Sequence, residues 1–277
     1  MAAGSLADRV ALVTGAGRGI GRAIADKLAV EGAHLVVNDL DPDELAATVT
    51  GVIEKGGKAI GCPGDVTRPS FGEEFVQAAL ASFGSVDIIV NNAGYTWDAV
   101  IQKMTDDQWQ AMLDVHVTAP FRILRAAAPW LREQARRDQA DGREVFRKVV
   151  NISSASGLGG NPGQANYAAA KSGINGLTKT LAKEWGRYRV NVNSVAFGLI
   201  RTRLTEAPSN DDGTINVDDK RIKVGVSAER FAAFEQSIPL GRGATPDEAA
   251  GAVYLLCTPE SDYITGHVLL CTGGIPM

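Results

Sequence analysis

The sequence predicts an α/β fold, with a doubly wound, mostly parallel sheet of seven strands and helices on both faces. Short runs rich in β-branched residues alternate with longer amphipathic stretches along the chain, which is typical of repeated β–α units. Several short runs are apolar throughout instead of at every second position, as in strands that are buried on both faces. Right-handed crossovers between such strands place helices on the two sides of one sheet.

The elements are expected in regular alternation. The first strand, Val10–Val13, is wholly apolar and leads into a glycine-rich turn and the first helix, Ile20–Glu31. The strands that follow are the runs Leu35–Val37, Ala59–Gly61, Val86–Val90, Val149–Ile152, Val190–Val195 and His267–Leu270. The amphipathic stretches between them, which we expect to be helices, are Asp43–Lys55, Phe71–Phe83, Asp106–Leu131, Ala165–Trp185 and Pro246–Leu256.

Two segments interrupt this alternation. The charged residues 133–147 are interpreted as a solvated helix end and loop. Residues from Leu199 to about Ser237, which include Pro208–Gly213, follow the sixth strand directly. Ligands of open α/β sheets bind beyond the carboxyl ends of the strands, so we expect the insertion at about 199–237 to be a substrate lid. Because no linker and no repeat of fixed period divides the chain, residues 1–277 are expected to form a single domain.

Composition narrows the class of protein. The chain has 277 residues, of which 45% are hydrophobic and 22% charged, and its net charge of −4 provides no basic surface for nucleic acid. Its 3 cysteines and 3 histidines are scattered, which argues against a disulfide framework and a zinc site. No apolar run approaches the roughly 18 residues of a membrane span, and the N-terminus does not resemble a signal peptide. We therefore expect a cytoplasmic protein that acts on a small molecule.

The glycine-rich turn predicts a dinucleotide site. It does not follow the common G-x-G-x-x-G pattern, because Gly15 and Gly17 match but Ile20 occupies the third position. It reads instead as G-x-x-x-G-x-G with Gly15, Gly19 and Gly21. These glycines allow a tight turn, a close backbone approach and packing of the helix on the strand. The free N–H groups at the helix N-terminus then face a pyrophosphate.

An acid at the end of the second strand favours NAD over NADP. Asp39 lies 24 residues after Gly15, near the spacing at which an acid accepts hydrogen bonds from the adenosine ribose. Its charge would repel a 2′-phosphate. Asp39 could instead cap the next helix, although Asp41 is placed to do so. Arg18 argues the other way, since an arginine in this turn could bind a 2′-phosphate.

A tyrosine and a lysine form a candidate acid–base pair. Tyr167 and Lys171 stand four residues apart in an expected helix and so share one face. A cation about 4 Å from a phenolate stabilises its negative charge by roughly 4 kcal/mol at an effective dielectric constant near 20. We therefore expect Lys171 to bring the pKa of Tyr167 from about 10 toward neutrality. Together with the dinucleotide site, the pair predicts redox chemistry at an alcohol or carbonyl carbon.

These residues, with others in the same order, resemble the short-chain dehydrogenase/reductase family, which has a Rossmann-type fold. The similarity covers nearly the whole chain and is greatest to 3-oxoacyl thioester reductases and related secondary-alcohol dehydrogenases of the single-domain branch. All the motifs occur in order and at ordinary spacing, which makes the resemblance specific. They are Gly15-x-x-x-Gly19-x-Gly21, Asp65-Val66, Asn91-Asn92-Ala93-Gly94, Ser154, Tyr167-x-x-x-Lys171 and Gly198-Leu-Ile-Arg-Thr202.

The resemblance implies a cofactor role for the motifs outside the glycine turn. Asp65 and Val66 would flank the adenine. The turn that contains Asn92, Ala93 and Gly94 would line the cofactor floor and brace the sheet. The positions that would meet the nicotinamide carboxamide and a nearby phosphate are Ile200 and Thr202.

The resemblance also assigns the catalytic roles. Tyr167 would be the general base in oxidation and the general acid in reduction, and Lys171 would hold the nicotinamide ribose. Ser154 would donate a hydrogen bond to the substrate oxygen. Ser153 and Ser156 are rival serines in the same turn, but Ser154 has the family's spacing to Tyr167.

Two positions depart from the family pattern. His116 stands where relatives place an asparagine that helps to hold a water on the proton route from the lysine to solvent. A histidine could replace that relay, block the water, or simply pack in the core. Phe197 stands where relatives often carry proline, and this change would reshape the nicotinamide pocket to which Ile200 and Thr202 belong.

The sequence thus predicts an NAD-dependent oxidoreductase that interconverts a secondary alcohol and a ketone without a metal. The favoured substrate is a 3-hydroxyacyl or 3-oxoacyl thioester, and the alternative is a hydrophobic steroid or terpenoid alcohol. A non-catalytic dinucleotide-binding regulator is a further alternative, supported only by His116. Family resemblance implies a homotetramer built through the long fourth and fifth helices and the C-terminal strand.

Overall fold

A seven-stranded parallel sheet forms the centre of the molecule. The computed structural model describes residues 4–202, 214–217, 220–223 and 228–275. The strands lie in the order β3-β2-β1-β4-β5-β6-β9, and every neighbouring pair is parallel. Their bounds are β1 (Val10–Val13), β2 (His34–Val37), β3 (Lys58–Gly61), β4 (Ile88–Asn91), β5 (Arg147–Ser154), β6 (Val190–Phe197) and β9 (Val268–Cys271). The predicted doubly wound α/β class is confirmed.

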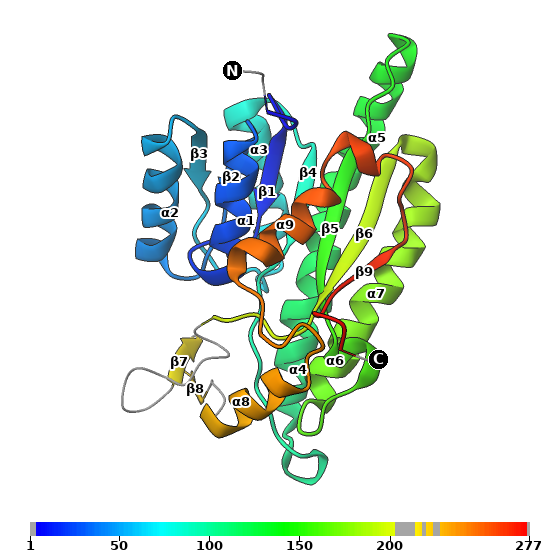
Figure 1. The fold of residues 1–277 in the computed structure, drawn as a ribbon. Helices are drawn as coiled ribbons and strands as arrows, with labels where there is room; N and C mark the ends of the chain where they lie inside the picture. Colours follow the sequence, from blue (N-terminus) through cyan, green and yellow to red (C-terminus); the bar gives the residue numbers. More distant parts are fainter. Residues whose placement is uncertain (1–3, 203–213, 218–219, 224–227, 276–277) are drawn as a thin grey trace.

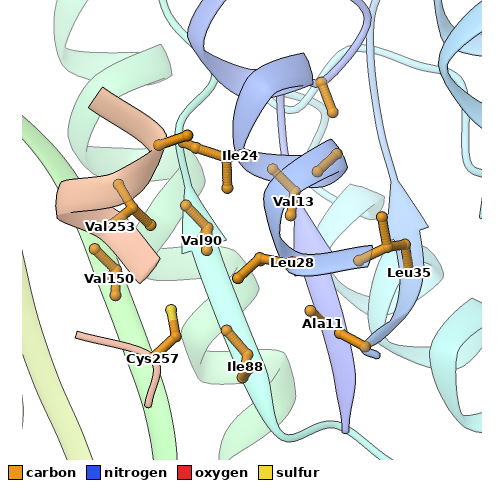
Figure 2. Packing of buried hydrophobic residues seen from close by; sticks show 14 of the residues in the cluster. Ala11, Val13, Ile24, Leu28, Leu35, Ile88, Val90, Val150, Val253 and Cys257 are labelled. Atoms are coloured by element: carbon orange, nitrogen blue, oxygen red, sulfur yellow. The ribbon is translucent and has the colours of Figure 1, made fainter. Parts of the chain in front are cut away.

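Helices cover both faces of this sheet, as Figure 1 shows. Alternate side chains of β1 lie on opposite faces of the sheet. Ala11 and Val13 pack in one apolar cluster, and Val10 and Leu12 pack in the other. The first cluster lies under α1 (Gly19–Val30), α2 (Pro42–Glu54) and α9 (Pro246–Leu255), and Figure 2 shows its centre. The second lies under α3 (Phe71–Phe83), α5 (Ala119–Ala140) and α7 (Ala165–Trp185). Such two-sided burial explains why the strands read as continuous apolar runs.

The helix predicted at Asp106–Leu131 forms, but it is not a regular α-helix throughout. The structure has α4 (Asp106–Leu113), a π-helical turn η2 (Asp114–Thr118) and then α5. Pro120 has no N–H group and cannot donate to the carbonyl four residues before it, at position 116, which favours an irregular turn at this point. Such π-helical turns often mark functional sites.

The charged residues 133–147 are less solvated than predicted. Helix α5 continues to Ala140, and two charged side chains beyond the predicted helix end are buried: Asp138 is 3% exposed and Arg147 is 5% exposed. Arg147 Nη1 donates to Asp138 Oδ2 at 2.8 Å, and Arg147 Nε lies 3.6 Å from Asp87 Oδ1. Burial of a charge requires such pairing, and here it fastens the end of α5 to the start of β5.

Part of the expected lid lies at the carboxyl end of the sheet. It contains an antiparallel hairpin of β7 (Thr214–Val217) and β8 (Lys220–Lys223), followed by α8 (Ala228–Gln236), which the sequence did not predict (Figure 1). The segment Pro208–Gly213 lies outside the described residues. Within the described part of the chain, none of the helices has the length and apolar character needed to cross a membrane.

Candidate active site

Three predicted catalytic side chains meet at the carboxyl end of β5. Ser154 is the last residue of this strand, and Tyr167 and Lys171 lie in the first two turns of α7. The Ser154 hydroxyl is close enough to the Tyr167 hydroxyl to lower the pKa of the phenol. Lys171 Nζ lies 5.6 Å from the centre of the Tyr167 ring and donates to Ile152 O at 2.7 Å. The helical spacing therefore brings phenol and ammonium together as predicted.

The neighbouring serines are engaged elsewhere. Ser153 Oγ is buried and donates to Lys171 O at 3.0 Å, which fastens α7 to β5. Ser156 Oγ donates to Gln164 Oε1 at 3.0 Å. Ser154 Oγ accepts from Ser156 N at 3.2 Å, which orients its hydroxyl. Ser154 is thus the serine of this turn that faces Tyr167.

Burial dominates the titration of the tyrosine–lysine pair. It raises the pKa of Tyr167 to about 12, with the negative charge of Asp98 acting in the same direction and the Ser154 hydrogen bond opposing it. Burial also lowers the pKa of Lys171 to about 7. The predicted near-neutral pKa of Tyr167 was therefore wrong for this structure, because the same burial that penalises the phenolate also removes much of the charge on Lys171. At neutral pH the phenol is a protonated acid.

His116 lies against this pair from the π-helical turn. Its side chain is 3% exposed, and its ring stands edge-on to that of Tyr167 with the centres 5.1 Å apart. Burial, reinforced by the positive charge of Lys171, holds the pKa of His116 well below its usual 6.5, so the imidazole is neutral.

The tautomer of His116 follows from its one hydrogen bond. His116 Nε2 lies 2.8 Å from Tyr95 O, and because a carbonyl only accepts, Nε2 carries the proton. His116 Nδ1 is then an acceptor, and it is a buried atom without a hydrogen-bond partner among the described residues. A buried unsatisfied acceptor is unusual and marks a place for a donor.

Gly94 makes room for the imidazole. A Cβ atom at this position would lie 2.2 Å from His116 Cε1 and 2.7 Å from His116 Nδ1. Such distances are impossible without moving the ring, so the glycine of the turn after β4 and the unusual histidine fit together.

The glycine-rich turn has the shape of a dinucleotide site. Gly15 has φ +63° and Gly19 has φ +55°, a region that favours glycine. A Cβ at Gly21 would lie 1.9 Å from Gly15 O, so helix and turn touch through backbone alone. Arg18 is the N-cap of α1, and its side chain makes no capping hydrogen bond. Uncapped N–H groups beside a close-fitting backbone match a pyrophosphate.

Acidic side chains line the end of β2 beside this turn. Asp39 Oδ2 accepts from Gly17 N at 2.8 Å and Asp39 Oδ1 accepts from Asp41 N at 3.1 Å. Each carboxylate oxygen accepts about two bonds, so both keep capacity for ribose hydroxyls. Asp41 caps α2, as predicted, and is paired with Arg18, whose guanidinium also lies 3.8 Å from Glu44.

The remaining predicted cofactor positions lie in the segments that follow β3, β4 and β6. Asn92 Nδ2 donates to Thr14 O and Gly15 O at 2.9 and 3.0 Å, which ties the turn after β4, with Ala93, to the glycine turn. Thr202 Cγ2 would lie 3.8 Å from a Cβ at Gly19. The other positions are Ile200, which is 3% exposed, Val66, which packs in the second core cluster, and Asp65, which accepts from Thr67 N.

Sequence reasoning missed the residues that hold the tyrosine in place. Asn166 is fully buried, donates to Trp97 O and Gln108 O, and accepts from Tyr167 N. It thereby joins the start of α7 to α4 and to the loop after β4. Its position next to Tyr167 was the only signal, and an asparagine at a helix start is usually read as a cap.

Comparison with known proteins agrees with this geometry. A family model described as enoyl-(acyl carrier protein) reductase matches residues 15–276. The chain is 38% identical to a 3-oxoacyl-[acyl-carrier-protein] reductase of Synechocystis sp. over 275 residues, 99% of each chain. It is 38% identical to the corresponding reductase of Vibrio cholerae over 273 residues, again 99% of each, and 34% identical to that of Thermotoga maritima over 270 residues, 98% of each.

Proposed function

Because the chain belongs to the short-chain dehydrogenase/reductase family of nicotinamide-dependent oxidoreductases, we propose that it reduces 3-oxoacyl thioesters to 3-hydroxyacyl thioesters. The observation that carries the proposal is the placement of Ser154, Tyr167 and Lys171 together at the carboxyl end of β5. The relatives named as 3-oxoacyl reductases over nearly their full length support the substrate class.

The protonation state of the site favours the reductive direction. When bound, the nicotinamide supplies the hydride. Tyr167, a neutral phenol whose pKa is about 12, gives its proton to the ketone oxygen. Ser154 donates a second hydrogen bond to that oxygen and holds it in place.

Lys171 and His116 supply the return path for the proton in this proposal. A pKa of about 7 lets Lys171 release and regain a proton at neutral pH, so it can restore the Tyr167 phenol. The free lone pair on His116 Nδ1 provides the fixed acceptor for a donor on that path. His116 thus replaces the asparagine of relatives as an acceptor, without itself changing charge.

We propose NADH as the preferred reductant. Asp39 keeps free acceptor capacity where the adenosine ribose would lie, and its charge opposes a 2′-phosphate. Arg18 is already paired with Asp41 and lies near Glu44, so its charge is largely compensated. Asp65, Val66, Ile200 and Thr202 complete the dinucleotide site, and the segment 199–237 acts as the substrate lid of a single domain.

We also propose a cytoplasmic homotetramer. Phe121 on α5 is 43% exposed and Leu270 on β9 is 49% exposed. Both lie on elements through which the family resemblance implies assembly, and their burial between subunits would remove apolar surface from water. Light scattering coupled to size exclusion tests this assembly, and a monomer at micromolar concentration would contradict it.

Steady-state kinetics test the substrate class directly. The wild-type protein is offered acetoacetyl-N-acetylcysteamine, the matching 2-enoyl thioester and a bulky cyclic ketone, each with NADH and with NADPH. We expect the largest kcat/KM for the 3-oxo thioester with NADH. A preference for the cyclic ketone would favour the steroid or terpenoid alternative, and a preference for the enoyl thioester would reject carbonyl reduction.

A further inference from the structure

The carboxylate of Asp98 lies beside this site and has no role in the chemistry described above. Asp98 lies in the loop between β4 and the short helix η1 (Ile101–Lys103), close to the start of α7. Ala99 N donates to Gly163 O at 2.9 Å, so this loop is joined to the loop that precedes α7. Figure 1 shows α4, α6 (Ser156–Gly159) and the start of α7 gathered at this end of the sheet.

A hydrogen-bond network fixes the orientation of Asp98. Gln164 Oε1 accepts from Ser156 Oγ at 3.0 Å and from Asn161 Nδ2 at 2.9 Å. The amide is thereby oriented with Nε2 toward Asp98, and it donates to Asp98 Oδ2 at 2.9 Å. The Thr96 side chain forms a further hydrogen bond to this carboxyl group. Asp98 is therefore held as an acceptor in one position.

Asp98 is an exposed carboxylate in the loop that packs against the start of α7. The surrounding protein raises the pKa of its carboxyl group through desolvation. The charge of Asp98 also raises the pKa of the Tyr167 phenol, so the field of this carboxylate reaches the atoms that bind the ketone.

The opposing positive charge is less accessible. Lys171 is 4% exposed, is bonded to Ile152 O, and carries only part of its charge at neutral pH because its pKa is about 7. Of the two charged side chains that act on the Tyr167 site, Asp98 is therefore the exposed one and Lys171 the buried one. His116, which packs against Tyr167, is buried and neutral and therefore adds no charge.

We propose that Asp98 selects against substrates with a negative charge next to the ketone, so that the enzyme accepts 3-oxo esters and thioesters and excludes free 3-oxo acids. This inference rests on the proposed function and deepens it. The carboxyl carbon of a 3-oxo acid is only two bonds from the ketone carbon, so a free carboxylate cannot avoid the field that reaches Tyr167. Thioester formation removes that charge and leaves the ketone unchanged.

The test compares two forms of one substrate. Acetoacetate and acetoacetyl-N-acetylcysteamine are reduced by the wild-type protein and by Asp98→Asn at saturating cofactor. Asparagine keeps an acceptor oxygen for Gln164 and removes the charge. We expect kcat/KM for acetoacetate to rise by on the order of tenfold, because the repulsion between two like charges is removed. We expect kcat/KM for the neutral thioester to stay within about threefold.

Two comparisons make the result decisive. Asp141→Asn makes the same change in net charge at the end of α5, six residues before the start of β5 and so toward the amino ends of the strands, and must leave the ratio of the two substrates unchanged. In the wild-type protein, salt must raise kcat/KM for acetoacetate relative to the thioester, because it screens the repulsion. This second measurement decides the matter should Asp98→Asn fail to fold.

The contradicting outcomes are distinct. Three results would overturn the selecting role of Asp98. Folded Asp98→Asn could keep the wild-type ratio of kcat/KM for acetoacetate to that for the thioester, or it could lose kcat/KM equally on both substrates. The third result is a wild-type ratio that does not change with salt. A wild-type protein that reduces neither the thioester nor acetoacetate overturns the proposed function itself.

Discussion

Replacing Lys171 by methionine tests how much the burial of the Lys171 ammonium lowers the free energy of unfolding. Lys171 is 4% exposed and its pKa is about 7, whereas an ordinary lysine titrates near 10.5. Because the folded-state pKa is lowered, the unfolded chain binds more protons, and stability must rise with pH between about 7 and 10.5. At 1.36 kcal/mol for each pKa unit, burial of Lys171 destabilises the fold by roughly 4 kcal/mol at pH 7 and by roughly 2 kcal/mol at pH 9.

Methionine removes this penalty and adds a smaller one. The variant loses the 2.7 Å hydrogen bond to Ile152 O, and a buried carbonyl left without a donor costs about 1–3 kcal/mol. We therefore expect Lys171→Met to be more stable than the wild type by roughly 1–3 kcal/mol at pH 7, with the difference close to zero at pH 9. The same variant must lose turnover, because nothing then restores the proton of Tyr167.

Urea unfolding at fixed protein concentration, followed by circular dichroism at the two pH values, measures this difference. A variant less stable than the wild type at pH 7 would refute the reasoning. So would a difference in unfolding free energy that does not shrink between pH 7 and pH 9.

Two other predictions concern the cofactor and the proton path. Asp39→Ala should lower the ratio of kcat/KM with NADH to that with NADPH by at least about tenfold, since ribose acceptors and a repulsive charge are removed together; an unchanged ratio in steady-state assays would reject the role of Asp39. His116→Asn should keep activity within about threefold because it keeps an acceptor, whereas His116→Leu should lose more than about tenfold in kcat. Equal rates for the two His116 variants would show that the imidazole only packs.

The sheet and most of the helices were predictable from sequence because parallel strands are buried on both faces. A wholly apolar run such as Val10–Val13 shows that burial directly. The π-helical turn η2 was not predicted, although Pro120 gives the physical reason for it. The buried pair of Asp138 and Arg147 was also missed, since two charged residues nine apart in a polar segment resemble solvated side chains until the fold brings them together.

The site was predictable in its parts and less so in its energetics. Helical spacing placed Tyr167 beside Lys171, but spacing says nothing of desolvation, which decides both pKa values. Asp98 and Gln164 lie 66 residues apart, and no local pattern joins them. Their contact depends on two loops that meet only when the sheet is complete.

The central claim is that Tyr167 acts as the neutral acid that protonates a 3-oxoacyl ketone. Tyr167→Phe removes one oxygen atom and leaves the ring against His116. The most direct measurement is kcat for reduction of acetoacetyl-N-acetylcysteamine by this variant, together with its NADH affinity from nucleotide fluorescence. We predict a loss in kcat of roughly a hundred- to ten-thousand-fold with NADH affinity unchanged. A kcat within a few-fold of the wild-type value would contradict the account.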